Sequence, residues 1–169
     1  DRKKCYQEYS LLLKAQQQVV PEKYLVMKAP DHMPNLGALL SAVPNARIVQ
    51  LHRNPTTCLT SLNSLFYSTH RAVTNDINPQ RLAEVNKKMF TYYLKMSHSH
   101  RSNPAITNAV LDVQYEQLVA DPMKTVKDIY AHFGVPWSDE YEERLQSFLS
   151  NHPKDKHGAH HYTPEQFGQ

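Results

Sequence analysis

The stretch ARIVQLHRNPTTCLTSLNSL (residues 46–65) limits most strongly what this chain can fold into. Its first part, residues 46–52, is a short apolar run of the kind that forms a buried strand. Asn54 then suits a helix N-cap, Pro55 suits the first helical position, and leucines follow at helical spacing. A buried strand that passes directly into a helix is a unit of α/β folds. The stretch therefore predicts a parallel sheet flanked by helices.

The rest of the chain continues this alternation. Two further apolar runs, residues 24–28 and 109–115, predict strands, and residues 72–79 predict a loop. Apolar residues at helical spacing predict helices over 6–18, 35–43, 55–70, 80–101, 121–134 and 138–151, followed by an irregular polar tail over 152–169. A chain of 169 residues suffices for one compact domain, so we expect a single α/β domain over 1–169 with right-handed crossovers.

Composition narrows the class of partner. Lysine and arginine (19) exceed aspartate and glutamate (16) by three, which suits an anionic small ligand and is far from a surface that coats nucleic acid. No apolar stretch approaches the ~18 residues that a membrane span needs, and the start does not resemble a signal peptide. We therefore expect no nucleic-acid partner and no membrane segment. The sequence leaves the location and the oligomeric state open, and the absence of a signal or membrane segment favours the cytoplasm.

Polar side chains follow each predicted strand. Proteins with parallel sheets bind ligands beyond the carboxyl ends of the strands, so these side chains are predicted to line one crevice. The alternative is that each of them simply emerges into solvent. The residues are Lys28, Asp31 and His32 after the first strand, His52 and Arg53 after the second, and Tyr115 and Glu116 after the third.

Arg53 is the clearest candidate for binding an anion. It precedes a helix whose first turn, PTTC, contains no acidic residue, so the positive end of the helix dipole is left without a complementary charge. A guanidinium beside a helix N-terminus offers donors that suit a phosphate group. Hydroxyl residues recur at helical spacing along the same helix: Thr57, Ser61, Ser64 and Ser68. They either line a ligand that lies along the helix or form a solvated helix face.

Three segments in order resemble a known family. The segment YLVMKAPDHMPNLGALLSAVPNARIVQLHRNPTTCLTSLNSLF is similar to the middle of sulfotransferases that use 3′-phosphoadenosine-5′-phosphosulfate (PAPS), in the branch with a lysine-small-proline-x-histidine segment before an HR[DN]P segment. The segments VQYEQLVADPMKTVKDIYAHFGVP and NHPKDKHGAHHYTPEQFG resemble later parts of that family. The resemblance implies a sulfotransferase fold of the P-loop-NTPase-like type, with PAPS as co-substrate.

The resemblance also implies a cofactor-binding set. Arg53 and Ser61 match the pair that holds the 3′-phosphate of the nucleotide, and Tyr115 matches a tyrosine near the adenosine. Eight helical residues rise by ~12 Å, so the phosphate is expected beside the helix rather than at its tip. The segment Lys156, His157 and Gly158 resembles a basic-basic-glycine turn around the same phosphate. His157 stands where a stronger cation is usual, which makes that contact pH-dependent.

The same likeness assigns two catalytic roles. His32 matches the general base that takes the proton of the acceptor, and Lys28 matches the lysine that meets the sulfonate and the leaving phosphate. Histidine titrates near neutrality and lysine carries a compact charge, so both residue types suit these tasks. The expected reaction is an in-line sulfonate transfer to a hydroxyl or amine of a small-molecule, glycan or lipid acceptor.

The sequence also departs from the family. Its four glycines are too far apart for a phosphate-cradling loop, and the Ser/Thr/Gly-rich loop of the kind PRSGTT, with which relatives grip the phosphosulfate, is missing. The chain opens within a helix and stops where relatives continue. We therefore expect an incomplete sulfotransferase domain, a fragment or truncated product whose activity in isolation is doubtful.

Alternatives follow from the same residues. The histidine clusters HSH (98–100) and HGAHH (157–161) lack the spacing of zinc-protease motifs and have no cysteine nearby, so we expect no metal. A kinase-type phosphotransferase would need a P-loop lysine and a magnesium-binding carboxylate, and neither can be assigned. The remaining alternative is a non-catalytic nucleotide-binding or scaffolding remnant of the same fold.

Overall fold

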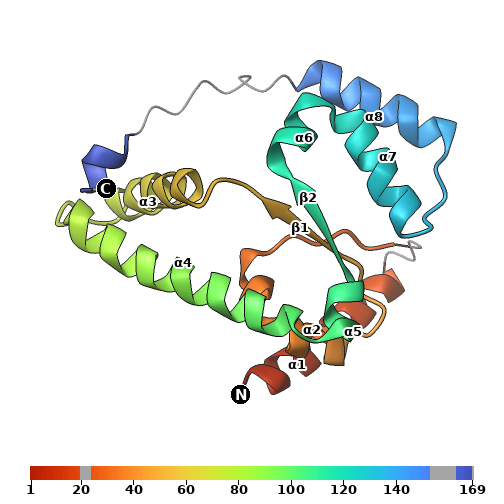
Figure 1. Ribbon diagram of the computed structural model, residues 1–169, viewed down its shortest axis with the longest axis horizontal. Coiled ribbons are helices and arrows are strands. Elements are labelled where there is room, and N and C mark those ends of the chain that lie inside the picture. The colour runs from red at the N-terminus through yellow and green to blue at the C-terminus, as the bar shows by residue number, and fades with distance from the viewer. Residues whose placement is uncertain (20–23, 153–162, 169) are drawn as a thin grey trace. The chain divides into compact units, whose positions relative to one another are not determined.

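The computed structural model describes residues 1–19, 24–152 and 163–168 (Figure 1). The chain forms two compact units. One consists of Asp1–Ile48 with Met89–Val110, and the other of Val49–Lys88 with Leu111–Gln169. Helices dominate both units, and the sheet is small and parallel. The predicted α/β class is therefore confirmed, with a larger helical share than the sequence pattern suggested.

The first unit is built from short helices around a small apolar core. It contains α1 (Arg2–Val19), the 3₁₀ helix η1 (Pro30–Asn35), α2 (Leu36–Ala42), α5 (Pro104–Asn108) and the later part of α4 (Pro79–Arg101). Leu36, Ile106 and Val110 form the buried cluster, and Leu40 and Ile48 pack against it. The predicted helix over 35–43 is confirmed, except that its start is drawn into the 3₁₀ turn by Pro34.

The second unit carries the strands and the helices that follow them. Strand β1 (Ile48–His52) pairs with β2 (Val110–Gln114), as Figure 1 shows. Helix α3 (Pro55–Arg71) follows β1, and β2 leads through α6 (Tyr115–Ala120) into α7 (Pro122–His132) and α8 (Asp139–Asn151). A short 3₁₀ helix, η2 (Pro164–Phe167), contacts α3 through Phe167 and Tyr67, whose rings lie 6.3 Å apart.

The predicted strand over residues 24–28 is wrong. Residues 24–29 have no regular secondary structure, and Val26 is 92% and Met27 49% exposed. An apolar run becomes a strand only when a neighbouring strand accepts its backbone hydrogen bonds. Within the described residues the sheet consists of β1 and β2 alone, so this run has no strand beside it. Helices α5 and α6 were not predicted either: the sequence pattern gave no element for residues 104–108 and 116–120, and it assigned Tyr115 to the end of a strand.

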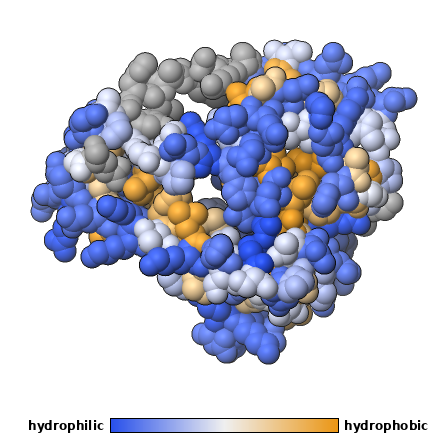
Figure 2. Space-filling model, in the orientation of Figure 1, coloured by the Kyte–Doolittle hydropathy of each residue, from blue (hydrophilic) through white to orange (hydrophobic). Residues whose placement is uncertain are grey.

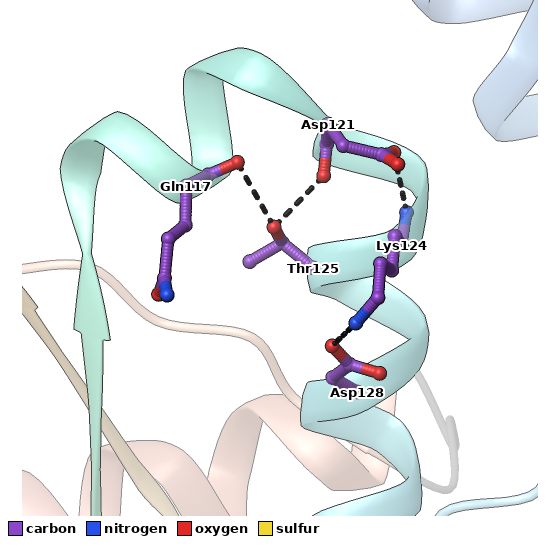
Figure 3. Close-up of polar contacts among 5 residues, drawn as sticks. All are labelled: Gln117, Asp121, Lys124, Thr125 and Asp128. Carbon is purple, nitrogen blue, oxygen red and sulfur yellow. Dashed lines mark hydrogen bonds and ion pairs between the residues drawn. The ribbon is translucent and has the colours of Figure 1, made fainter.

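The turn between α6 and α7 is held by side chains (Figure 3). The Asp121 carboxylate accepts a hydrogen bond from the Lys124 backbone N–H at 2.9 Å and so caps α7. The Thr125 hydroxyl donates to the backbone oxygens of Gln117 and Asp121 at 3.2 and 2.8 Å. The Lys124 ammonium lies 2.5 Å from Asp128 one turn further on. These contacts join α6, which begins at the end of β2, to α7.

A buried polar pair joins α3 to α4 within the second unit. The Asn86 side chain donates to the Asn63 side-chain oxygen at 2.9 Å, and the two residues are 4% and 0% exposed. The other polar atom of Asn63, Nδ2, has no hydrogen-bond partner in the described part of the chain. Buried polar groups stabilise a fold only while they are paired, so this contact is sensitive to change.

We expect Asn86→Ala to destabilise the protein by about 2 kcal/mol, because it leaves a buried amide oxygen unpaired. Urea unfolding followed by circular dichroism measures this as a lower midpoint with an unchanged slope. Asn86→Ala combined with Asn63→Ala should cost less than the sum of the single changes, because the two amides depend on each other. Additive costs would contradict the pairing.

The surface of the protein is mainly hydrophilic. Most of the face that Figure 2 shows is hydrophilic, and hydrophobic residues are visible there as separate patches. Exposed leucines and valines include Leu11, Leu12 and Val19 on α1. Within the described residues, no helix combines the length and the apolar character that crossing a bilayer requires.

Candidate functional site

Arg53 lies in a pocket at the end of β1. The pocket has a volume of about 400 Å³ and is open to solvent. One wall comes from the start of α3 and the other from α6, which follows β2, so the carboxyl ends of both strands contribute to it, as expected for a parallel sheet. The lining residues are Arg53, Asn54, Thr57, Tyr115, Glu116, Val119 and Ala120.

Within this pocket Arg53 stacks on Tyr115. The guanidinium carbon lies 4.5 Å from the centre of the tyrosine ring, which is within the range of a cation–π contact. Asn54 caps α3 by accepting the Thr57 backbone N–H at 3.2 Å, as the sequence predicted. The first turn of α3 holds no acidic residue. The arginine is therefore fixed by a ring on one side and stands beside an uncompensated helix N-terminus on the other.

The charges at this pocket have both signs. Burial raises the pKa of the Cys58 thiol on α3, while the positive charge of Arg53 lowers it and the negative charge of Glu116 raises it. A carboxylate in the same pocket disfavours a second anion but accepts hydrogen bonds from hydroxyl or amino groups. The pocket accordingly offers both a cation and a carboxylate to a ligand.

Ser61 lies outside the set of residues that line this pocket. It is half-buried on α3, six residues beyond the first helical residue, Pro55, which corresponds to ~9 Å along the helix. For both residues to contact one group of a ligand, the Arg53 side chain must therefore reach along α3 toward Ser61.

His32 is in the first unit, on η1, and is held by two tyrosines of α1. Its Nδ1 lies 2.9 Å from the Tyr6 hydroxyl, and its ring centre lies 5.7 Å from that of Tyr6 and 5.5 Å from that of Tyr9. Burial lowers the pKa of His32, and the neighbouring Asp31 carboxylate raises it. The net lowering keeps the imidazole neutral at pH 7, which is the form that accepts a proton.

Asp31 is bound in turn from α4. The Tyr93 hydroxyl donates a hydrogen bond to the Asp31 carboxylate, and this bond is the main reason why the pKa of Tyr93 is raised. Lys28 lies in the irregular segment before η1 and is exposed. The segment therefore presents the Lys28 ammonium to solvent while His32 is enclosed by α1.

The remaining predicted site residues lie outside the described residues. These are Lys156, His157 and Gly158. In the described part of the chain, no group of three or more His, Cys, Asp or Glu side chains is arranged to hold a metal ion.

Two contacts of these residues were not predicted from the sequence. Tyr6 and His32 are 26 residues apart, and a tyrosine on a helix can equally well be an ordinary packing residue. His52 Nε2 and the Asp112 carboxylate lie 2.7 Å apart across the two strands. An aspartate in the middle of an apolar strand was the available signal for that pair.

Relatives were found by sequence and by structure. Two proteins named omega-hydroxy-beta-dihydromenaquinone-9 sulfotransferase Stf3, from Mycobacterium bovis and Mycobacterium tuberculosis, are 22% identical to this chain over 146 residues, which is 85% of the chain. The crystal structure of sulfotransferase STF9 from Mycobacterium avium superposes with a TM-score of 0.75 at 24% identity and also covers 85% of the chain. The chain spans 37% of the length of each of these proteins.

The superposition shows that the chain has the fold of a sulfotransferase over most of its length. The family model described as "Sulfotransferase family" matches residues 4–139, which includes both strands, the Arg53 pocket and the His32 segment. Since this match covers most of the sequence, the chain belongs to the sulfotransferase family.

Proposed function

We propose that this chain is the nucleotide-binding and proton-accepting part of an enzyme that transfers a sulfonate group from PAPS to an acceptor hydroxyl or amine. The observation that carries this proposal is the Arg53 pocket. It combines a stacked arginine, the N-terminus of α3 without a first-turn acid, and the ends of two parallel strands. Within the sulfotransferase family this combination suits the anionic end of a nucleotide.

In this proposal Arg53 and Ser61 bind the 3′-phosphate of the nucleotide, with the guanidinium fork donating to two phosphate oxygens. Tyr115 lies near the adenosine, and Glu116 accepts hydrogen bonds from its hydroxyl or amino groups. The basic segment Lys156, His157 and Gly158 adds a second cationic contact. The donor set fits a nucleotide with a 3′-phosphate, and no step requires a metal.

His32 is the proposed general base and Lys28 the proposed partner of the sulfonate and the leaving phosphate. The acceptor oxygen or nitrogen forms a bond to sulfur while the bond from sulfur to the bridging phosphate oxygen breaks. The acceptor proton passes to the neutral His32 imidazole, and negative charge develops on the leaving phosphate, where a lysine ammonium stabilises it. The lowered pKa of His32 supports the base role, since the ring is unprotonated at neutral pH.

The names of the relatives support a proposal for the acceptor class. Both curated relatives are named for omega-hydroxy-beta-dihydromenaquinone-9. We therefore propose a hydroxyl group on an apolar, lipid-like molecule as the first acceptor class to test, ahead of amines and glycans.

Ligand selectivity tests the nucleotide assignment. Calorimetric titration of the protein should give at least ~10-fold tighter binding of 3′-phosphoadenosine 5′-phosphate (PAP) than of adenosine 5′-monophosphate. A charged hydrogen-bonding contact contributes about 1.5–3 kcal/mol, and the two ligands differ only in the 3′-phosphate. Equal affinities would refute the assignment of Arg53 to a 3′-phosphate.

A further inference from the structure

Tyr6 of α1 makes the one side-chain hydrogen bond to the His32 ring that is found among the described residues. The Tyr6 hydroxyl lies 2.9 Å from His32 Nδ1, and His32 Nε2 has no hydrogen-bond partner in the same part of the chain. Tyr9, one turn further along α1, contacts the ring through its own ring only. The two ring nitrogens of His32 therefore differ, because Nδ1 has the Tyr6 hydroxyl as its neighbour and Nε2 has no such partner in the described segments.

The Tyr6 hydroxyl is itself held in position. Tyr6 is 8% exposed, and so is Asn35 on the last turn of η1. The Asn35 side chain donates to the Asp31 backbone oxygen at 2.8 Å, and it lies close enough to the Tyr6 phenol to lower its pKa. Burial raises the pKa of the Tyr6 phenol, so it remains protonated at neutral pH. A buried, neutral phenol with fixed neighbours can orient an imidazole without contributing a charge.

We propose that Tyr6 is a positioning residue that accepts a hydrogen bond from His32 Nδ1–H and thereby leaves Nε2 as the nitrogen that receives the acceptor proton. The inference rests on the proposed function of His32 as the base. A phenol can either donate to an imidazole nitrogen or accept from it. Only the second arrangement puts the ring proton on Nδ1 and leaves a lone pair on Nε2. It also lets the Tyr6 oxygen stabilise the imidazolium that forms during transfer.

This arrangement makes a prediction about the titration of His32. A hydrogen-bond acceptor at Nδ1 favours the protonated ring, so its removal should lower the pKa of His32 further. A donor at Nδ1 would have the opposite effect, because it favours the neutral ring. The other groups near His32 are unchanged by the substitution. Asp31 on η1 and Tyr9 on α1 act on or contact His32 itself, Arg2 on α1 acts on Tyr6, and Tyr93 on α4 bonds Asp31.

The test is nuclear magnetic resonance of the protein with ¹⁵N-labelled histidine, comparing the wild type with Tyr6→Phe. We expect the proton of the neutral wild-type ring on Nδ1, and a His32 pKa that falls by about 0.5 to 1 pH unit in Tyr6→Phe. Tyr9→Phe is the matched control, since it keeps the ring contact and removes a hydroxyl that does not bond His32. A ring proton on Nε2, or a pKa that rises in Tyr6→Phe, would overturn the inference.

Turnover of the complete natural protein separates this inference from the proposed function. We expect Tyr6→Phe to lower kcat about 10-fold with an unchanged KM for PAPS, and to move the acid limb of the pH profile to lower pH. In His32→Ala the additional change Tyr6→Phe should have no effect, because the base that Tyr6 positions is gone.

The contrary outcomes differ. Full turnover of His32→Ala would refute the assignment of His32 as the base, and the proposed role of Tyr6 would be refuted with it. An inactive His32→Ala together with a Tyr6→Phe variant whose rate and pH profile match those of Tyr9→Phe would overturn the role of Tyr6 alone. Should Tyr6→Phe lose its fold by circular dichroism, the ring-proton position in the wild type still decides the inference.

Discussion

Replacing Arg53 by alanine is expected to weaken binding of PAP by at least ~30-fold, which is the largest change in affinity that any single substitution in the described part of the chain should cause. Truncating one member of a hydrogen-bonded charge pair costs about 2–5 kcal/mol, and Arg53 is exposed, which places the expected loss at the lower end. The tyrosine on which it stacks, Tyr115, loses its cation–π partner in the same variant. Isothermal titration measures the loss directly.

Two further variants show whether the loss of affinity comes from the charge and the position of Arg53. Arg53→Lys keeps the charge but loses the planar fork and the stack, so we expect an affinity between those of wild type and Arg53→Ala. Arg71→Ala is the matched control. Arg71 lies at the other end of α3 and also contacts a tyrosine ring, that of Tyr67 at 5.9 Å. If Arg53→Ala binds PAP as the wild type does, or if Arg71→Ala loses binding equally, the pocket is not the phosphate site.

His32→Ala is expected to separate binding from transfer. Binding of PAP should stay within about twofold of wild type, because His32 is assigned to the acceptor side of the reaction. The rate of sulfonate transfer should fall by ~10²–10⁴-fold, the range for loss of a general base. The pKa of His32 is lowered by burial, so wild-type turnover should fall only below about pH 6.5, as the ring takes up a proton.

The control for this variant is His98→Ala. His98 is exposed on α4, in the HSH cluster, and it should leave both binding and turnover unchanged. Full turnover of His32→Ala would exclude it as the base. A loss of PAP binding together with transfer would mean instead that His32 supports the nucleotide site or the fold.

The part of the site that is local in sequence was predictable. Asn54, Pro55 and the leucines of α3 determine where β1 ends and where the helix begins, and this order brings Arg53 to the pocket through neighbouring residues alone. The same holds for the cap of α7, because the Asp121-Pro122 pair at the start of a helix carries its own signal. A helix start or cap depends on a few neighbouring residues, so the sequence allows few alternative positions for it.

Contacts between distant segments were not predictable from periodicity. Residues 24–28 have the composition of a buried strand, yet strand formation depends on a neighbour that the pattern does not identify. Likewise, Tyr6 and His32 meet because α1 and η1 belong to the same packed unit. The roles of all the candidate site residues remain predictions from the family resemblance: Lys28, His32, Arg53, Ser61, Tyr115 and the segment 156–158.

Transfer of labelled sulfonate is the most direct test of the central claim. The complete natural protein is incubated with PAPS carrying ³⁵S in the sulfonate and with a dihydromenaquinone that bears an omega-hydroxyl group, beside alcohols and amines of other classes. The account predicts that label moves to a hydroxyl acceptor, that one PAP forms for each sulfonate transferred, and that His32→Ala abolishes both. Tight binding of PAP without transfer to any acceptor would contradict it and would identify a non-catalytic nucleotide-binding protein of the sulfotransferase fold.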